Sequence, residues 1–446
     1  MIRMKRRSIG MVLFFLTAST LSAVAQQRYA FSAKDAVEYA KKNNVQVKNA
    51  LVDVLIQEQT NKEVTASAYP QISSTLSGTG YIKLPTTLIP GEFFGQPAGT
   101  HIPVKFGTKF NESAGVSLQQ LLFDGQVFIG LQARNATMQF ARKAEEVTEE
   151  NIIANVYKIY YQLAASNNQL SILDANIARV QKFLNDTRKS FENGFAEKLD
   201  ISKLEVQLAN LQTEKIKAQN GIDNGYLGLK LLMGMPVQDS LVLTETVNES
   251  DIRNGVLDAS VYNYTDRKDY QYAELGKELN QFNIKRYKLS KLPTVNLNAA
   301  YSTSRQDNTF GFGAPWFKTS FVGMSINIPI FSGGAKDARI RSAQLDLQKT
   351  QNNIDALKIS IDNDVRQSIN NYSSALATLD AQKRNMDLAE TVYNQTQLKF
   401  QNGVGSQTEI STAQSDLQVA QSNYILALYD AINAKIDFLK ATGKLQ

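Results

Sequence analysis

Hydrophobic and polar residues follow two different periods along this chain, and the switch between the periods occurs twice. From Phe31 to Ala68 the apolar residues recur at helical spacing, with Ser32 as a helix N-cap and a break near 42–44. After Pro70 apolar and polar residues alternate, which is typical of a half-exposed strand. Four alternating runs predict strands at about 70–81, 106–123, 293–304 and 317–331. The Pro-, Gly- and Phe-rich segment between the first two is expected to be a loop.

A long helical pattern follows each pair of strands and contains no proline for about 65 residues. At about 1.5 Å per residue, such a helix is roughly 100 Å long. Apolar residues recur in alternating steps of four and three, which is the seam of a coiled coil. In the first pattern the seam residues are Ile152, Val156, Ile159, Leu163, Ser166, Leu170, Leu173, Ile177, Val180 and Leu184. The pattern predicts two antiparallel helical hairpins, at about 125–233 and 333–442.

The chain is an internal duplication. Leu122-Phe123-Asp124-Gly125 joins a strand to a long helix, and Ile330-Phe331-Ser332-Gly333 does the same 208 residues later. A repeat of this length is a whole supersecondary unit rather than a short solenoid module. We therefore predict a first structural repeat at 26–233, a linker at 234–258 and a second repeat at 259–446. The predicted class is α+β, with four strands and two helical hairpins per chain.

The amino terminus has the pattern of a secretory signal peptide. Four basic residues precede an apolar stretch, and Ala23-Val24-Ala25 supplies the small residues of a cleavage site. The predicted signal peptide is 1–25. The alternative, an uncleaved anchor, is disfavoured because the apolar stretch is shorter than the ~20 residues that a membrane-spanning helix needs.

Composition excludes several classes of function. The chain has no cysteine and one histidine, His101, so a disulfide framework, a zinc site or a catalytic histidine site has almost no material. Without the signal peptide the formal net charge falls from +6 to +2, which does not indicate a nucleic-acid surface. We expect no enzymatic activity, no cofactor and no bound metal.

The predicted strands have the features of membrane-spanning β-strands. Each is about 10 residues long, the length that a tilted strand needs to cross a bilayer. Aromatic residues at the strand ends match an interfacial girdle, namely Tyr81, Phe106, Phe110, Trp316 and Phe317. The alternative is an ordinary half-buried sheet, which shows the same alternation. Four strands cannot close a membrane barrel, whereas three copies would supply twelve.

The order and duplication of these elements resemble the TolC family of outer-membrane efflux proteins (outer-membrane factors). The resemblance rests on the two strand-to-helix junctions and on the Asn-Gly turns at Asn193-Gly194 and Asn402-Gly403. It implies a homotrimer with a 12-stranded β-barrel in the outer membrane of a Gram-negative bacterium and a coiled-coil tunnel in the periplasm. The implied partners are a periplasmic adaptor (membrane fusion) protein, an inner-membrane transporter and outer-membrane lipid.

The resemblance also assigns roles to particular residues. By position, the adaptor-contacting tips are Gly194, Phe195, Ala196, Gly403, Val404 and Gly405. The implied lining of the periplasmic entrance is Glu409, Ser411 and Gln414. The implied function is the channel-tunnel of a tripartite efflux or type I secretion system, through which substrates leave passively. The alternative is a periplasmic coiled-coil scaffold or adaptor protein that transports nothing. Drug efflux, metal efflux and protein secretion all fit the sequence.

Overall fold

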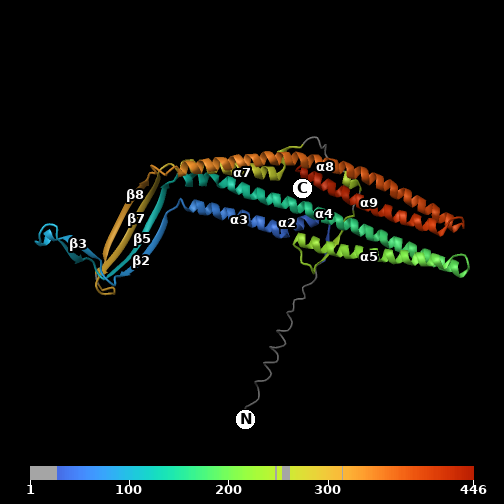
Figure 1. The fold of residues 1–446 in the computed structure, drawn as a ribbon, viewed down its shortest axis with the longest axis horizontal. Helices are drawn as coiled ribbons and strands as arrows, with labels where there is room; N and C mark the ends of the chain where they lie inside the picture. Colours follow the sequence, from blue (N-terminus) through green and yellow to red (C-terminus); the bar gives the residue numbers. More distant parts are fainter. Residues whose placement is uncertain (1–27, 247–248, 254–261, 314, 446) are drawn as a thin grey trace, which may run out of the picture. The chain divides into compact units, whose positions relative to one another are not determined.

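The computed structural model describes residues 28–246, 249–253, 262–313 and 315–445, so the predicted signal peptide lies outside the described residues. Figure 1 shows the order of the elements along the chain. The chain divides into two compact units, the first made of residues up to 49, 148–267 and 361–446, and the second of 50–147 and 268–360. Each unit contains segments of both sequence repeats.

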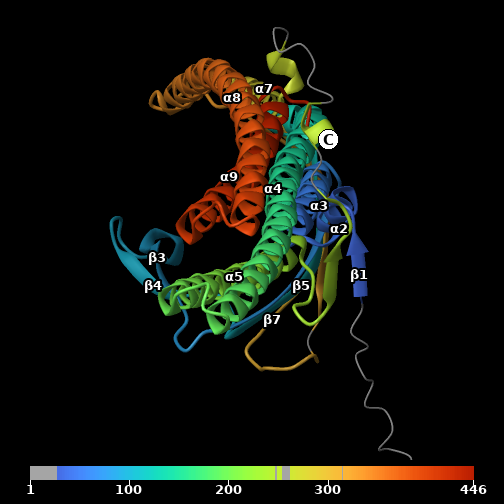
Figure 2. The same cartoon turned by 90° about the vertical axis from the view of Figure 1, so that its right-hand side faces the viewer.

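The first unit is built on helical hairpins. Helix α4 (Gly125–Glu192), which belongs to this unit from residue 148, is followed by α5 (Lys198–Met233). Helix α8 (Ala335–Gln401), which belongs to it from residue 361, is followed by α9 (Gln407–Ala441). Figures 1 and 2 both show each long helix beside its return helix. In the first hairpin the predicted seam is buried, with Leu173, Val180 and Leu184 of α4 packed with Leu204 and Leu211 of α5.

A mixed core joins these hairpins to the amino-terminal elements of the same unit. Strand β1 (Arg28–Phe31) pairs in parallel with β6 (Ser240–Leu243), and α2 (Ala33–Asn43) begins at the predicted N-cap Ser32, which forms a capping box with Asp35. The hydroxyl of Tyr160, fully buried in α4, donates to the carbonyl oxygen of Phe31 at 2.9 Å. The core is therefore assembled from segments that are distant in sequence.

The second unit contains an antiparallel four-stranded sheet in the order β2-β5-β7-β8. The strands are β2 (Gln71–Gly80), β5 (Phe110–Phe123), β7 (Thr294–Asp307) and β8 (Phe317–Asn327). The central pair, β5 and β7, joins the two repeats, and β2 and β8 are the edges.

Helices also belong to this second unit. Helix α3 (Val45–Ala66) enters it from the first unit, and α7 (Lys268–Leu289) lies wholly within it. The side chain of Asn61 in α3 donates to the carbonyl oxygen of Arg134 in α4 at 3.0 Å, and the ring of Tyr272 in α7 stacks on that of Phe140, with 4.3 Å between centroids. These contacts fix the helices that lead into the strands.

The segment expected to be a loop contains regular structure. Strand β3 (Thr86–Pro90) and strand β4 (His101–Lys105) form an antiparallel hairpin around the 3-10 helix η1 (Gly91–Phe94). The prediction of an irregular loop was therefore wrong. Two five-residue strands, one ending at Pro90 and the other containing Pro103, are too short to give a readable alternation. The remaining connections include helix α6 (Glu249–Arg253) and the 3-10 helix η2 (Tyr264–Asp266).

Candidate functional site

The two faces of the four-stranded sheet differ sharply in chemistry. Paired residues of neighbouring strands share a face, so the register assigns each side chain. One face, here called the apolar face, carries Ile72, Leu76, Val116, Leu118, Val295, Leu297, Ala299, Tyr301, Val322, Met324 and Ile326. The large residues of β2 and β8 on this face are exposed in the single chain. A surface of this kind requires an apolar environment.

The opposite face, here called the polar face, is formed mainly by serine, threonine, asparagine and glutamine. Its hydroxyl groups pair across the strands, as in Ser73 with Ser117 at 2.8 Å and Ser77 with Ser113 at 2.7 Å. The amide of Asn298 donates to the hydroxyl of Ser325 at 3.0 Å. None of the residues that the register places on this face of the four described strands is charged. The polar face is suited to contact with water.

The structure places the predicted girdle residues at or beside the loop ends of the strands. Phe110 lies at the end of the apolar face, where its ring meets that of Phe310 edge-on at 5.6 Å, and Trp316 stacks with Phe312 at 6.5 Å. Tyr81 follows β2 directly, and Phe106 is exposed just after β4. Phe317 does not fit the girdle, because it pairs with Ser304 on the polar face.

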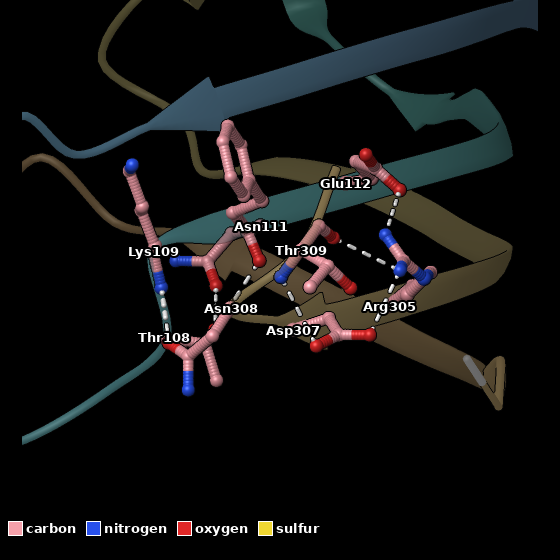
Figure 3. Close-up of polar contacts among 9 residues, drawn as sticks. Thr108, Lys109, Asn111, Glu112, Arg305, Asp307, Asn308 and Thr309 are labelled. Atoms are coloured by element: carbon pink, nitrogen blue, oxygen red, sulfur yellow. Dashed lines mark hydrogen bonds and ion pairs between the residues drawn. The ribbon is translucent and has the colours of Figure 1, made fainter. Parts of the chain in front are cut away.

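A buried charge cluster lies on the apolar face at the loop end of β5 and β7, and the sequence did not predict it. Figure 3 shows Arg305 between Glu112 and Asp307, each 2.9 Å from a guanidinium nitrogen, with the carbonyl oxygen of Thr309 at 3.1 Å. Arg305 is only 2% exposed. Such burial requires that the ions be paired. Glu112 and Arg305 face each other only because the register aligns strands 193 residues apart.

Both helical hairpins end in similar turns. Gly194 and Gly403 have positive φ angles of 79° and 73°, a conformation that glycine adopts without strain. The amide N–H of Phe195 donates to the carbonyl of Ser190, and that of Val404 to the carbonyl of Lys399, at 2.8 and 3.1 Å. These turns hold Phe195 (87% exposed) and Val404 outward in a similar way. The tips thus share a backbone and differ in the side chain presented.

Aromatic contacts connect the two hairpins near these tips. The ring of Phe183 in α4 meets that of Phe400 in α8 at 5.3 Å, and the guanidinium of Arg179 lies 4.9 Å from the ring centre of Tyr393. The amide of Asn176 donates to Gln421 of α9 at 3.2 Å. These contacts join residues of different hairpins, so the heptad pattern of a single hairpin does not predict them.

The residues expected to line the entrance have different environments. Glu409 is exposed in the first turn of α9, 3.6 Å from the ammonium of Lys399, and Ser411 is half-buried. Gln414 is only 2% exposed. In the single chain this side chain is buried beside the seam residue Ala413, so of the three residues only Glu409 and Ser411 are open to solvent.

Helix α6 is anchored to the second hairpin. The carboxylate of Glu249 accepts from the ammonium of Lys383 and from the hydroxyl of Tyr424, both at 2.7 Å, and these two bonds hold the pKa of Glu249 below its usual value. Burial, and then the bond to Glu249, raises the pKa of Tyr424. Ile252 is fully buried, and its carbonyl accepts from Tyr372 at 2.8 Å. A helix of five residues is too short to produce a periodic pattern in the sequence.

Two further features were sought among the described residues: a metal site and a membrane-spanning helix. Among them, no three histidine, aspartate or glutamate side chains are grouped so that they could hold a metal ion. His101 is exposed in β4. None of the described helices has both the length and the apolar character that crossing a membrane requires.

Comparisons with known proteins agree with this architecture. The sequence model of the outer membrane efflux protein family matches residues 36–235 and 266–444. Outer membrane protein TolC of Vibrio cholerae is 22% identical over 342 residues, which cover 75% of this chain and 77% of TolC. Alkaline protease secretion protein AprF of Pseudomonas aeruginosa is 24% identical over 347 residues, covering 74% and 68% of the two chains. The crystal structure of CusC has the same fold, with a TM-score of 0.75, 19% identity and 93% coverage of both chains.

Proposed function

The chain belongs to the outer membrane efflux protein family, and from this premise we propose that it is the outer-membrane channel of an efflux or type I secretion system. It is located in the outer membrane of a Gram-negative cell. The observation that carries the proposal is the four-stranded sheet with one apolar and one uncharged polar face. A scaffold protein that transports nothing has no need for such a sheet.

The working form is a homotrimer. The edges of the sheet, β2 and β8, each have a ladder partner on one side only within the described chain. Unpaired edges in a bilayer leave backbone groups unsatisfied, which costs several kcal/mol per group. Three copies joined edge to edge give a closed 12-stranded barrel with the apolar face toward lipid. The sheet has bilayer-spanning length, since its strands contain 10 to 14 residues.

The partners are the other components of the pump. The tips at Gly194–Ala196 and Gly403–Gly405 dock a periplasmic adaptor protein, which connects the channel to an inner-membrane transporter. Support comes from the outward side chains of Phe195 and Val404, because exposed apolar residues on a rigid turn are typical of binding surfaces. Glu409 and Ser411 lie beside the second tip and contribute to the entrance. We assign the chain no enzymatic activity.

Reconstitution tests the proposal. The mature protein, purified in detergent, is expected to be a trimer by native mass spectrometry and to give stepwise, ohmic currents in planar bilayers. A folded monomer without conductance would contradict it. An otherwise identical preparation from cells that lack the gene provides the control for contaminating porins.

A further inference from the structure

The polar face carries two aromatic side chains among residues that are otherwise small or polar. Phe317 and Phe321 are the only aromatic residues that the register places on this face of the four described strands. Both lie on β8, two residues either side of Thr319, so about 13 Å separates their backbone positions. A solvated face gains nothing from two phenylalanine rings.

The neighbours of these rings leave them open. On the β7 side, Phe321 is paired with Ala300 and Phe317 with Ser304, and neither small side chain covers a phenyl ring. On the other side the proposed trimer places β2 of the next copy, whose residues on this face are Gln71, Ser73, Thr75, Ser77 and Thr79. In the single chain Phe321 is 57% and Phe317 63% exposed. Residues on the opposite face of the same strand, such as Val322, are also exposed, but they have lipid as their proposed environment. The register therefore separates apolar residues that lipid covers from two that lipid does not reach.

We infer that Phe317 and Phe321 form an aromatic contact site in the bore, which binds aromatic amphiphiles during their exit. This inference rests on the proposed function, since it requires the polar face to line a channel. The absence of charge from the described strands on this face means that the sign of a solute's charge has little effect on its binding there. Ring stacking provides the affinity, and its geometry favours flat aromatic solutes.

The orientation of the two faces can be measured with single cysteines, because the natural chain contains none. Phe321→Cys and Val322→Cys are adjacent and point to opposite faces. A membrane-impermeant charged methanethiosulfonate reagent should react with Phe321→Cys and lower the single-channel conductance, while Val322→Cys should not react. The opposite pattern, or an unreactive Phe321→Cys, would overturn the inference. Phe317→Cys serves as a second variant if Phe321→Cys does not assemble.

Binding is tested by current blockade. We expect 2-naphthalenesulfonate and 2-naphthylmethylammonium to block wild-type channels transiently, whereas methanesulfonate and ethylammonium do not. In Phe317→Ser with Phe321→Ser the residence time of both aromatic probes should fall about tenfold. A tenfold change corresponds to about 1.4 kcal/mol, which is close to the contribution of one ring contact. Phe317→Tyr with Phe321→Tyr should keep the blockade, and Thr319→Ser is the matched control on the same strand.

These experiments distinguish a failure of the proposed channel function from a failure of the aromatic site alone. A trimer without conductance would overturn the proposed function and, with it, the aromatic site. A conducting trimer whose blockade is unchanged in the double serine variant would overturn the aromatic site alone. Blockade by only the cationic or only the anionic probe would also overturn it, because charge rather than stacking would then select the solute.

Discussion

The ring of Phe183 in helix α4 meets the ring of Phe400 in helix α8 edge-on, with 5.3 Å between the centroids and an interplanar angle of 84°. The two residues belong to different hairpins. Phe183 also packs against the buried clusters of both hairpins, around Leu184 in one and Tyr393 in the other. This pair is therefore a physical link between the two halves of the duplicated chain near their tips.

We predict that removing either ring loosens this link. An edge-to-face pair contributes about 0.5–1.5 kcal/mol beyond the area it buries. Phe183→Ala and Phe400→Ala should each increase proteolysis of the hairpin tips. The double variant should increase it by less than the sum of the two single effects, because the contact between the rings is lost only once. Phe191→Ala, an exposed aromatic position in the same helix, is the control. Additive effects of the two single substitutions would show that the rings act independently.

The buried cluster around Arg305 gives a prediction about stability. Arg305→Met leaves Glu112 and Asp307 without their cation, and breaking a buried pair in this way costs about 3–5 kcal/mol. We expect a lower midpoint of thermal unfolding, which circular dichroism in detergent measures. Adding Glu112→Gln to Arg305→Met should restore part of the loss, since it removes an uncompensated charge. An unchanged midpoint for Arg305→Met is incompatible with a structural role for the cluster.

The anchor of helix α6 should depend on pH. Because its bonds to Lys383 and Tyr424 hold the pKa of Glu249 below the ordinary value of 4.5, the anchor is complete above that value. Its contribution is lost as the pH falls through the lowered pKa and the carboxylate takes up a proton. Amide hydrogen exchange of 249–253, corrected for intrinsic rates, should show less protection at pH 3 than at pH 7. In Glu249→Gln the protection should be weak at both values, and equal protection in the wild-type protein at pH 3 and 7 contradicts the prediction.

The unlike tips should contribute unequally to partner binding. Phe195 is a large exposed ring and Val404 a smaller side chain on an equivalent turn. Aromatic residues dominate binding energies at interfaces, so Phe195→Ala should weaken binding to the periplasmic adaptor of the same organism at least about tenfold. Val404→Ala should have a smaller effect. Surface plasmon resonance on the detergent-solubilised channel measures both, with Gln212→Ala in α5 as a control away from the turns.

Sequence periodicity predicted the elements whose signal is local. The heptad seam of α4 and the glycine-marked turns depend on residues within one or two turns of each other, and they were found correctly. The ion pair of Arg305 with Glu112 depends on a register between two repeats, which no local pattern specifies.

Side-chain direction at element ends was predicted least well. Phe317 is the first residue of β8, and a shift of one position moves it from the apolar to the polar face. Gln414 lies next to the seam of α9, where the helical period alone does not decide between the buried and the solvated side. For both residues the position in the sequence does not specify the direction of the side chain, which depends on the register and on helix packing.

The central claim is that three copies close one barrel through the β2 and β8 edges, and disulfide-length cross-linking tests it most directly. Ser73→Cys in β2 is combined with Thr319→Cys, Gly323→Cys or Ser325→Cys in β8, in a chain that otherwise has no cysteine. For at least one pair, we predict that the largest covalent product contains three chains and that its yield does not change when the protein is diluted. A product confined to single chains, or an open ladder that continues beyond three, would contradict a closed trimeric barrel.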